Sequence, residues 1–252
     1  MPKLTALGLS PEGNRSYLVY GPTGAGKTTL FTTIPGKKFS YVFDPGGLTA
    51  LAGQDIDYQL FLPDTTLGLR RTIKGKRDVK SPKPKEPIAY SSFEAHLEDF
   101  LEEGIHDYDL IGFHSLTSLQ IMVMERLLWV QGRWGQQPEF ADYNMLGETM
   151  MAIFRTLLGK GVSVFAEAHS DLVQDEVSRK VINRMDLTKG VRRFLPRLVS
   201  EVWAASTFVE GGDAVYQVQT MPSKEFPVAK NTYGLRPFAT VTLDLKRDST
   251  TQ

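Results

Sequence analysis

The chain has 252 residues, long enough for one α/β domain with its own buried core, and we expect residues 1–252 to form a single domain. Its 29 Lys and Arg residues equal its 29 Asp and Glu residues, so no overall charge draws the protein to nucleic acid or to an anionic membrane. The lack of cysteine excludes disulfides and thiolate metal sites, and without a signal peptide or a run of 18 apolar residues we expect a soluble cytoplasmic protein with no membrane partner.

Short apolar runs alternate with helical patterns over most of the chain. Strands are predicted at residues 16–20, 39–43, 58–62, 110–113 and 162–168, and helices at 92–103, 118–130 and 145–158. This alternation indicates an α/β fold with a mostly parallel sheet and helices on both faces. After residue 200, turn residues separate strand-like runs at 201–210, 214–220 and 238–245, which predicts antiparallel strands at the far edge.

The predicted strand at 16–20 leads directly into a phosphate-binding motif. Residues 21–28 read GPTGAGKT and fit the pattern G-x-x-x-x-G-K-[ST] without a mismatch. The glycines let backbone amides turn toward phosphate oxygens, and the following helix adds the positive end of its dipole. We expect Lys27 to reach the β- and γ-phosphates and Thr28 to place its hydroxyl on Mg²⁺. The residues predicted to contact ATP or GTP are Gly21, Pro22, Thr23, Gly24, Ala25, Gly26, Lys27, Thr28 and Thr29.

A strongly basic segment follows the third predicted strand. Residues 69–87 contain eight Lys or Arg, two acidic residues, three prolines and almost no apolar residue. A segment of this composition cannot bury a core, so we expect a surface excursion. It is either a solvated loop or a contact for nucleic-acid phosphates.

The order of the remaining motifs resembles the RecA-like core. The similarity is greatest to phage-type RecA-like P-loop ATPases, AAA-domain proteins of the single-strand annealing and recombination type. It covers YVFDPGGL at 41–48, EEGIHDYDLIGFHSLTSL at 102–119, DYNMLGETM at 142–150, VSVFAEAHSD at 162–171, and the segments 187–203 and 216–234. The last two look like closing strands and a basic element that family members present to a neighbour's nucleotide. The resemblance implies ATP, Mg²⁺, a homo-oligomer and, for a phage protein, the cytoplasm of a bacterial host.

Three positions depart from the family pattern. His114 stands where the family has the aspartate that holds the water shell of Mg²⁺, and an imidazole is a poor partner for a hard cation. Gly46 stands where a glutamate often orients the attacking water, so Asp44 is the nearest acid. In the basic element Lys230 is retained, but Thr232 replaces its usual cationic companion.

Candidate roles follow for individual residues. The candidate metal site comprises Thr28, Asp44 and His114, where Asp44 could partly replace the missing aspartate from the adjacent strand. The candidate catalytic residues are Lys27, Asp44, Glu167 as another carboxylate on a nearby strand, His169 at the family's sensor position and Lys230 of the basic element. Alternatively, His114 and His169 are strand-end histidines with no catalytic role, and Asp44 stabilises the turn before Pro45.

The substitution at His114 bears on hydrolysis. Losing the aspartate should weaken turnover more than nucleotide binding, so we expect a slow ATPase, with nonhydrolytic binding as the rival interpretation. Restoring the acid with His114→Asp is expected to raise turnover, unless the new charge near Asp44 and Glu167 costs stability.

The resemblance also places single-stranded DNA along two loops at the carboxyl side of the sheet, residues 130–143 and 170–193. Cations that follow a phosphate backbone beside an aromatic ring are typical of sequence-tolerant single-strand binding. Mixed charges make a solvated surface an equal alternative for the second loop. The residues expected to contact DNA are Arg133, Trp134, Arg179, Lys180, Arg184, Lys189, Arg192 and Arg193.

Two other functions share the phosphate-binding motif. A small-molecule P-loop kinase could use residues 69–87 as a lid, although the strand-rich carboxyl-terminal third suits a RecA-like core better. An ATP-binding assembly or packaging subunit would rely on oligomer contacts and hydrolyse little ATP. Stimulation of phosphate release by single-stranded DNA is expected only for the recombination protein.

Overall fold

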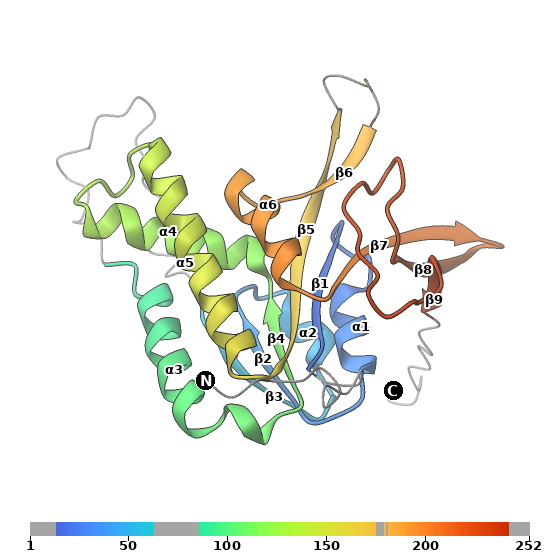
Figure 1. Cartoon of the computed structure of the whole chain (residues 1–252), viewed down its shortest axis with the longest axis horizontal. Coiled ribbons are helices and arrows are strands. Elements are labelled where there is room, and N and C mark those ends of the chain that lie inside the picture. The colour runs from blue at the N-terminus through green and yellow to red at the C-terminus, as the bar shows by residue number, and fades with distance from the viewer. Residues whose placement is uncertain (1–13, 63–85, 175–178, 180, 242–252) are drawn as a thin grey trace, which may run out of the picture.

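The computed structural model describes residues 14–62, 86–174, 179 and 181–241. Its nine strands belong to one sheet (Figure 1). The strands are β1 Ser16–Gly21, β2 Lys38–Val42, β3 Ile56–Leu60, β4 Leu110–His114, β5 Ser163–Gln174, β6 Val181–Met185, β7 Glu201–Glu210, β8 Asp213–Gln219 and β9 Phe238–Val241. All of the strands predicted from the sequence are present, but β5 ends six residues beyond the predicted strand at 162–168, and residues 242–245 of the last predicted strand lie outside the described residues.

The strand order is β3-β2-β4-β5-β1-β7-β8-β9, and β6 pairs with β5 outside this path. The pairs among β1 to β5, and the pair of β1 with β7, are parallel. The pairs of β7 with β8 and of β8 with β9 are antiparallel, as predicted for the far edge. Because β5 lies between β1 and β4, the strand of the phosphate motif and the strand of His114 are separated as in a RecA-like P-loop core, and the predicted fold class is confirmed.

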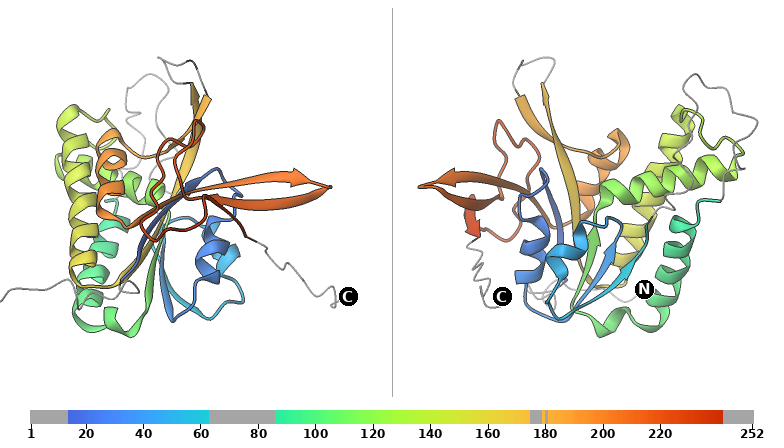
Figure 2. Two further views of the ribbon diagram at one scale, coloured as in Figure 1. Left: turned by 45° about the vertical axis from the view of Figure 1, so that its right-hand side comes forward. Right: turned by 180° about the vertical axis from the view of Figure 1, so that it is seen from behind.

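Helices cover both faces of the sheet (Figure 2). One face carries α1 and α2, and the other carries α3, α4, α5 and α6. Their bounds are α1 Lys27–Thr33, α2 Gly47–Leu51, α3 Ala89–Glu103, α4 Leu116–Val130, α5 Phe140–Gly159 and α6 Lys189–Leu198, with a short 3₁₀ turn at Ile105–Asp107. None of the helices in the described part of the chain is both long and apolar enough to cross a membrane.

Aromatic side chains fill the core between β2, β4 and α3. The rings of Tyr41 and Phe93 meet edge to face with centroids 5.1 Å apart, and Phe113 packs 5.3 Å from Tyr41. All three side chains are buried. Burial of each ring contributes about 2 kcal/mol, so this cluster helps to fix the positions of β2 and β4, whose carboxyl ends carry Asp44 and His114.

Two sequence predictions on the second half of the chain are wrong. Residues 170–193 were expected to form a loop, but β5 continues to Gln174 and pairs with β6, from Ser170 opposite Met185 to Gln174 opposite Val181. Residues 187–203 were expected to supply closing strands, but their first part forms α6, because apolar residues at 191, 195 and 198 follow a helical spacing. The basic excursion at 69–87 lies outside the described residues except for Glu86 and Pro87.

The strands β7 and β8 form a two-stranded ribbon that extends beyond the rest of the sheet (Figures 1 and 2). The base of β7 pairs with β1, from Tyr17 opposite Glu201 to Tyr20 opposite Ala204. The ribbon therefore passes beside the phosphate motif, and the hydroxyl of Thr207 donates to the carbonyl oxygen of Gly24 over 3.4 Å.

Candidate nucleotide site

The phosphate motif connects β1 to α1 through two glycines in the left-handed region. Gly24 has a φ of +80° and Gly26 a φ of +76°, conformations that L side chains rarely adopt. Gly21 is required for another reason, because a Cβ at this position would lie 2.3 Å from the carbonyl oxygen of Ala205 on β7. The sequence thus folds into a turn that can direct its amides toward an anion at the start of α1.

A cavity of about 570 Å³ opens at this turn. It lies at the carboxyl ends of the central strands, where ligands bind in open α/β sheets. Its walls are formed by the phosphate motif, the carboxyl ends of β2 and β4, the middle of β5, α2 with the turn before it, and one residue of β8. The lining residues are Thr23, Gly24, Gly26, Lys27, Thr28, Thr29, Asp44, Pro45, Gly46, Gly47, Ala50, His114, Ser115, Glu167, His169 and Tyr216.

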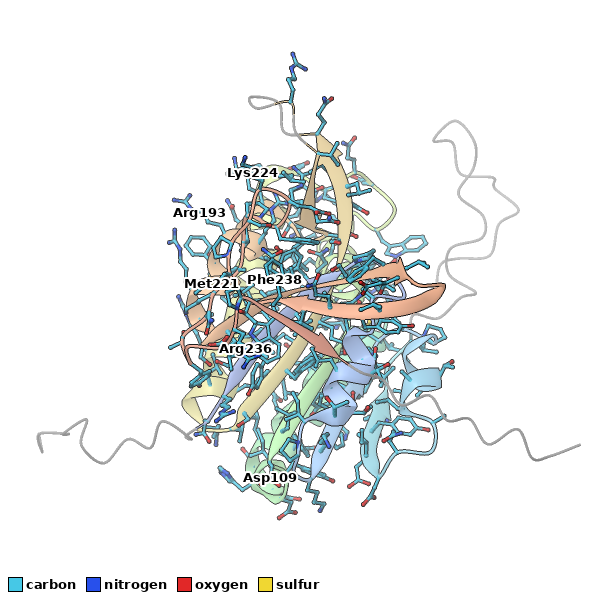
Figure 3. All side chains as sticks on the ribbon, turned by 90° about the vertical axis from the view of Figure 1, so that its right-hand side faces the viewer. Asp109, Arg193, Met221, Lys224, Arg236 and Phe238 are labelled. Carbon is cyan, nitrogen blue, oxygen red and sulfur yellow. The ribbon has the colours of Figure 1, made fainter. Side chains whose placement is uncertain are left out.

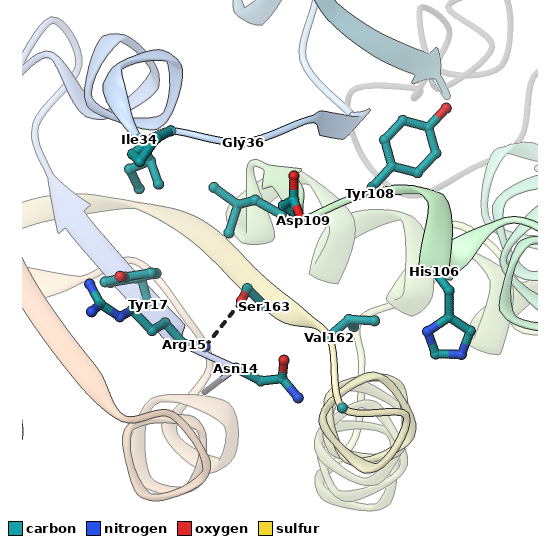
Figure 4. A pocket seen from close by; sticks show the side chains of 13 residues that line it. Asn14, Arg15, Tyr17, Ile34, Gly36, His106, Tyr108, Asp109, Val162 and Ser163 are labelled. Atoms are coloured by element: carbon teal, nitrogen blue, oxygen red, sulfur yellow. Dashed lines mark hydrogen bonds between the residues drawn. The ribbon is translucent and has the colours of Figure 1, made fainter. Parts of the chain in front are cut away.

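A second cavity of about 640 Å³ lies at the opposite edge of the sheet (Figure 4). Tyr17, Leu110 and Ser163, which line it, stand at or next to the first residues of β1, β4 and β5. Gly36 and Asp109 also border this cavity. It is therefore separated from the phosphate motif by the length of the strands.

Lys27 is buried at the first position of α1. Its Nζ donates to the carbonyl oxygens of Gly21 and Pro22, each over 2.9 Å. Burial lowers the pKa of Lys27, while the carboxylates of Glu167 and Asp44 act in the opposite direction. The ammonium group is thus held across the loop by neutral acceptors, which an anionic ligand can replace.

Thr28, His114 and Glu167 form a hydrogen-bonded cluster beside Lys27. The Thr28 hydroxyl lies 2.7 Å from His114 Nε2 and 3.3 Å from Glu167 Oε2. His114 Nδ1 lies 3.0 Å from the same carboxylate oxygen of Glu167. When the proton is on Nδ1, the ring donates to Glu167 and accepts from Thr28, so His114 connects the first turn of α1 to the acid on β5.

The imidazole of His114 is buried and closely packed. A Cβ on Gly47 would lie 2.5 Å from its Cδ2, so the ring occupies space that only a glycine leaves open. Burial acts most strongly and lowers the pKa of His114, but the charge and hydrogen bond of Glu167, together with the charge of Asp44, raise the pKa above its ordinary value. The histidine therefore belongs to the wall of the cavity and is paired with an acid.

Asp44, at the end of β2, has different partners. Its Oδ2 accepts from the backbone N–H of Ser115 over 3.1 Å and from the Ser115 hydroxyl over 2.7 Å. The hydroxyl of Ser118 donates to Oδ1. These contacts hold the first turn of α4, where Ser115 is the N-cap. The side chain lines the cavity, but its oxygens are already committed to the start of a helix.

His169 stands at the edge of the cavity on β5, at the position predicted for a sensor. Its backbone N–H donates to the Thr117 hydroxyl over 3.0 Å. The ring atom Nδ1 is buried and has no hydrogen-bond partner among the described residues. Burial, followed by the charge of Lys27, lowers the pKa of His169. His169 lines the cavity, and a buried polar atom that lacks a partner among the described residues is one that a polar ligand could satisfy.

The protein oxygens beside the phosphate motif fit a magnesium ion. Thr28 and Glu167 place a hydroxyl and a carboxylate oxygen 3.3 Å apart, and oxygen donors are those that Mg²⁺ prefers. Within the described residues, no group of three His, Asp or Glu side chains could hold a metal alone. At a P-loop site, phosphate oxygens of a nucleotide would complete the ligand set. The predicted set of Thr28, Asp44 and His114 is less suitable, because Asp44 serves α4 and His114 offers nitrogen.

Lys230 does not line the cavity. Its backbone pairs with Val202 near the start of β7, and its Nζ donates to the carbonyl oxygen of Val199 over 2.5 Å. The neighbouring Thr232 donates its N–H to Glu201 Oε1 and its hydroxyl to the Ser200 carbonyl oxygen. The structure thus places this basic element at the amino end of β7, away from the phosphate motif of the same chain.

Tyr216 is a cavity residue that was not predicted from the sequence. It lies on β8 opposite Thr207, and its ring packs onto Gly26. The sequence around Tyr216 predicted a strand, but it did not indicate that this strand would approach the turn between β1 and α1. The pairing of β7 with β1 is what brings the ribbon to this turn.

The residues predicted to contact DNA in the first loop are engaged within the chain. Arg133 donates to the buried carboxylate of Asp142, and its Nη1 lies 3.2 Å from Glu139 Oε1. The Trp134 ring meets that of Trp129 edge to face at 6.2 Å between centroids. The charge of Arg133 is therefore matched already, which makes this residue less suited to a phosphate.

The predicted cations of the second segment are in two kinds of environment. Arg192 is half-buried and donates to the carbonyl oxygens of Met185 and Leu187 over 3.3 and 3.2 Å. Arg179, Arg184, Lys189 and Arg193 are exposed. Lys180 lies outside the described residues.

Helix α6 presents an exposed positive face. It contains Lys189, Arg192, Arg193 and Arg197 and no acidic residue. The guanidinium groups of Arg193 and Arg197 lie 5.8 and 5.5 Å from the ring centroid of Phe194, which is 38% exposed. In the described part of the chain no carboxylate forms an ion pair with either arginine. Figure 3 labels Arg193 and two further exposed cations, Lys224 and Arg236.

Comparison with known proteins gives a family match and structural matches that span most of the chain. A family model described as an AAA domain matches residues 13–233. A search of curated proteins finds no match. Among solved structures, the flagellar accessory protein FlaH from Methanocaldococcus jannaschii matches over 87% of this chain and 83% of its own, at 10% sequence identity and a TM-score of 0.40. A structural match at that level carries no argument about function, whereas the family match covers the whole nucleotide site.

Proposed function

Because the chain belongs to the AAA-domain family, we propose that it is an ATPase that binds ATP with Mg²⁺ and hydrolyses it slowly. The observation that supports this most directly is the contact of Thr28 with Glu167 beside a complete phosphate motif. The acid that the sequence lacks at His114 is available from the adjacent strand, one residue beyond the pair of Phe113 and Ala166.

The side chains divide the work of binding. The turn at Gly24 and Gly26 can direct amides at the phosphates, and Lys27 exchanges its two carbonyl partners for phosphate oxygens. Thr28 supplies a hydroxyl oxygen. A magnesium ion, when bound, offsets phosphate charge and adds electrostatic stabilisation during transfer.

Glu167 and His169 line the cavity at positions from which they could assist ATP hydrolysis. Glu167 keeps a carboxylate next to the Thr28 hydroxyl while His114 holds it in position. His169 lines the same cavity, and its ring atom Nδ1 has no hydrogen-bond partner in the described part of the chain. We expect slow turnover because a buried imidazole shares the carboxylate that must serve the nucleotide.

Calorimetric titration with ATP and Mg²⁺ tests the binding proposal. Lys27→Ala should weaken ATP affinity by about a hundredfold, because a charged hydrogen-bond donor to the phosphates is lost. Lys160→Ala, which removes an exposed lysine at the end of α5, is the matched control and should leave affinity unchanged. Equal affinity of the Lys27→Ala variant and the wild type would refute a phosphate site at this loop.

We further propose that the chain acts on single-stranded DNA in recombination or annealing, through the positive face of α6. An uncompensated cluster of cations attracts phosphates, and the exposed Phe194 between Arg193 and Arg197 offers a ring for a base. This differs from the sequence prediction, which relied equally on Arg133 and Arg192. Both of those have partners within the chain.

Binding of a fluorescent single strand across a salt series tests the DNA proposal. Replacing Arg193 and Arg197 by Ala should lower affinity and reduce the slope of log affinity against log salt by roughly 0.7 for each lost phosphate contact. Arg155→Ala, on the exposed part of α5, is the control. An unchanged slope would place the DNA elsewhere, and phosphate release that DNA does not stimulate would favour an assembly subunit or a kinase.

A further inference from the structure

Tyr216 reaches the nucleotide cavity from the ribbon of β7 and β8. Its strand partner is Thr207, which is bonded to Gly24 of the phosphate motif. The Tyr216 ring lies over the end of the motif, since a Cβ on Gly26 would be 2.9 Å from its Cδ1 and 3.5 Å from its Cε1. The ring is half-buried and lines the cavity with Thr29.

The chemistry of this ring differs from that of the other cavity walls. The turn of the loop and Lys27 can bind phosphates, because they offer hydrogen-bond donors and positive charge. A phenol ring offers instead a broad apolar face. Among the residues that line the cavity, the other aromatic rings are the imidazoles of His114 and His169. Both nitrogens of His114 already have partners, Thr28 and Glu167.

We propose that Tyr216 is the stacking surface for the purine base of the bound nucleotide. The proposal rests on ATP binding at the phosphate motif and adds the element that recognises the base. A ring that packs on Gly26 is anchored next to the phosphates, so a nucleotide held by Lys27 brings its base within reach of the ribbon. Stacking on an aromatic face accepts any base and favours the larger purines.

The positive φ of Gly26 is one reason for a glycine at this position, and the contact with Tyr216 gives a second reason. Any side chain at this position would displace the Tyr216 ring, because the contact of a Cβ would be shorter than atoms allow. The loop and the ribbon are therefore fitted to each other. A base stacked on Tyr216 would connect ATP binding to the ribbon and, through Thr207, back to Gly24.

The test compares ATP with inorganic tripolyphosphate, which has the phosphates but no base. Calorimetry with the full chain should show that Tyr216→Ala weakens ATP and GTP binding about tenfold and leaves tripolyphosphate binding unchanged. Tyr216→Phe should bind ATP like the wild type, because it keeps the aromatic face. Gln217→Ala, the next residue of β8 on the opposite side of the strand, is the control.

Other outcomes separate the possible failures. An equal loss of ATP and tripolyphosphate affinity in Tyr216→Ala would mean that the ring only supports the loop, and would overturn the stacking role. Tyr216→Leu guards against loss of packing on Gly26 because it keeps apolar bulk, and unchanged ATP affinity in this variant would also overturn the role of the ring. If the wild type binds neither ligand, the nucleotide site itself is refuted.

Discussion

A residue just after β2 and a residue within β5 each bring a carboxylate to the same cavity, and the two carboxylates have different partners. Asp44, after β2, accepts hydrogen bonds from Ser115 and Ser118 and holds the start of α4. Glu167, within β5, contacts Thr28 and His114, which are cavity side chains. Lining a site is therefore a weaker indication of function than the partners that a carboxylate has.

The comparison also accounts for the histidine on β4. His114 and Glu167 follow paired residues of adjacent parallel strands and so point the same way. A carboxylate was expected on β4, but here Glu167 on the neighbouring strand β5 supplies it, and the imidazole of His114 occupies the expected position on β4. A P-loop site can thus keep a carboxylate near its threonine although the usual aspartate is missing.

Replacing Glu167 should produce the largest effect on turnover. We expect Glu167→Gln to lower steady-state phosphate release about a hundredfold, the scale of losing one positioned catalytic group. ATP affinity should change less than about threefold, since the phosphate motif is intact. Glu148→Gln on the exposed face of α5 is the control. Turnover equal to that of wild type would show that Glu167 serves only to hold His114.

Asp44→Asn should have its main effect on stability. An amide cannot accept all of the hydrogen bonds that the carboxylate takes from Ser115 and Ser118, and charged hydrogen bonds are each worth about 1.5–3 kcal/mol. Urea unfolding should show a loss of about 2 kcal/mol with a smaller drop in turnover than for Glu167→Gln. A variant of full stability and abolished turnover would reverse the roles of the two acids.

The phosphate motif and the sheet that carries the two acids could be predicted from the sequence. The motif at 21–28 is local, because its glycines, Lys27 and Thr28 follow one another in the chain. The alternation of strands and helices likewise predicted the sheet and its antiparallel edge. Both depend on short-range patterns that the fold does not override.

The partners of Asp44 and Glu167 were not accessible in this way. They depend on which strands are neighbours and in which register, since Phe113 lies opposite Ala166 in a pair far apart in the chain. Helix α6 was missed because its four cations and Pro196 conceal an apolar stripe at 191, 195 and 198. Tyr216 was missed because the ribbon meets the loop only through tertiary pairing.

The substitution His114→Asp would add a third acid to the cavity, beside Asp44 and Glu167. The sequence alone favours higher turnover in His114→Asp, but the contact of His114 with Glu167 reverses that expectation. Two carboxylates side by side disfavour double ionisation, so one of them should have a raised pKa. We expect turnover no higher than wild type and a loss of about 1–2 kcal/mol in urea unfolding. His114→Asn, which adds no charge, should lose less stability, and increased turnover in a stable His114→Asp variant would contradict this account.

Asp142 extends the comparison to a carboxylate with no role in the cavity. It accepts from the backbone N–H of Glu139 over 2.7 Å at the start of α5 and from the Arg133 guanidinium. Like Asp44, it serves the first turn of a helix. The Glu139 N–H and then Arg133 hold the pKa of Asp142 below its ordinary value.

A lowered carboxyl pKa gives stability that is complete above the pKa of the unfolded chain and is lost as the pH falls through the folded pKa. The wild type should therefore lose stability below about pH 4, the ordinary aspartate value, and Asp142→Asn should lose less over the same interval because it has no proton to take up. Urea midpoints measured between neutral and acidic pH test this. Parallel curves for the two proteins would show that Arg133 and Glu139 do not bind the ionised form preferentially. ATP affinity at neutral pH should be unchanged in Asp142→Asn, because the start of α5 does not line the cavity.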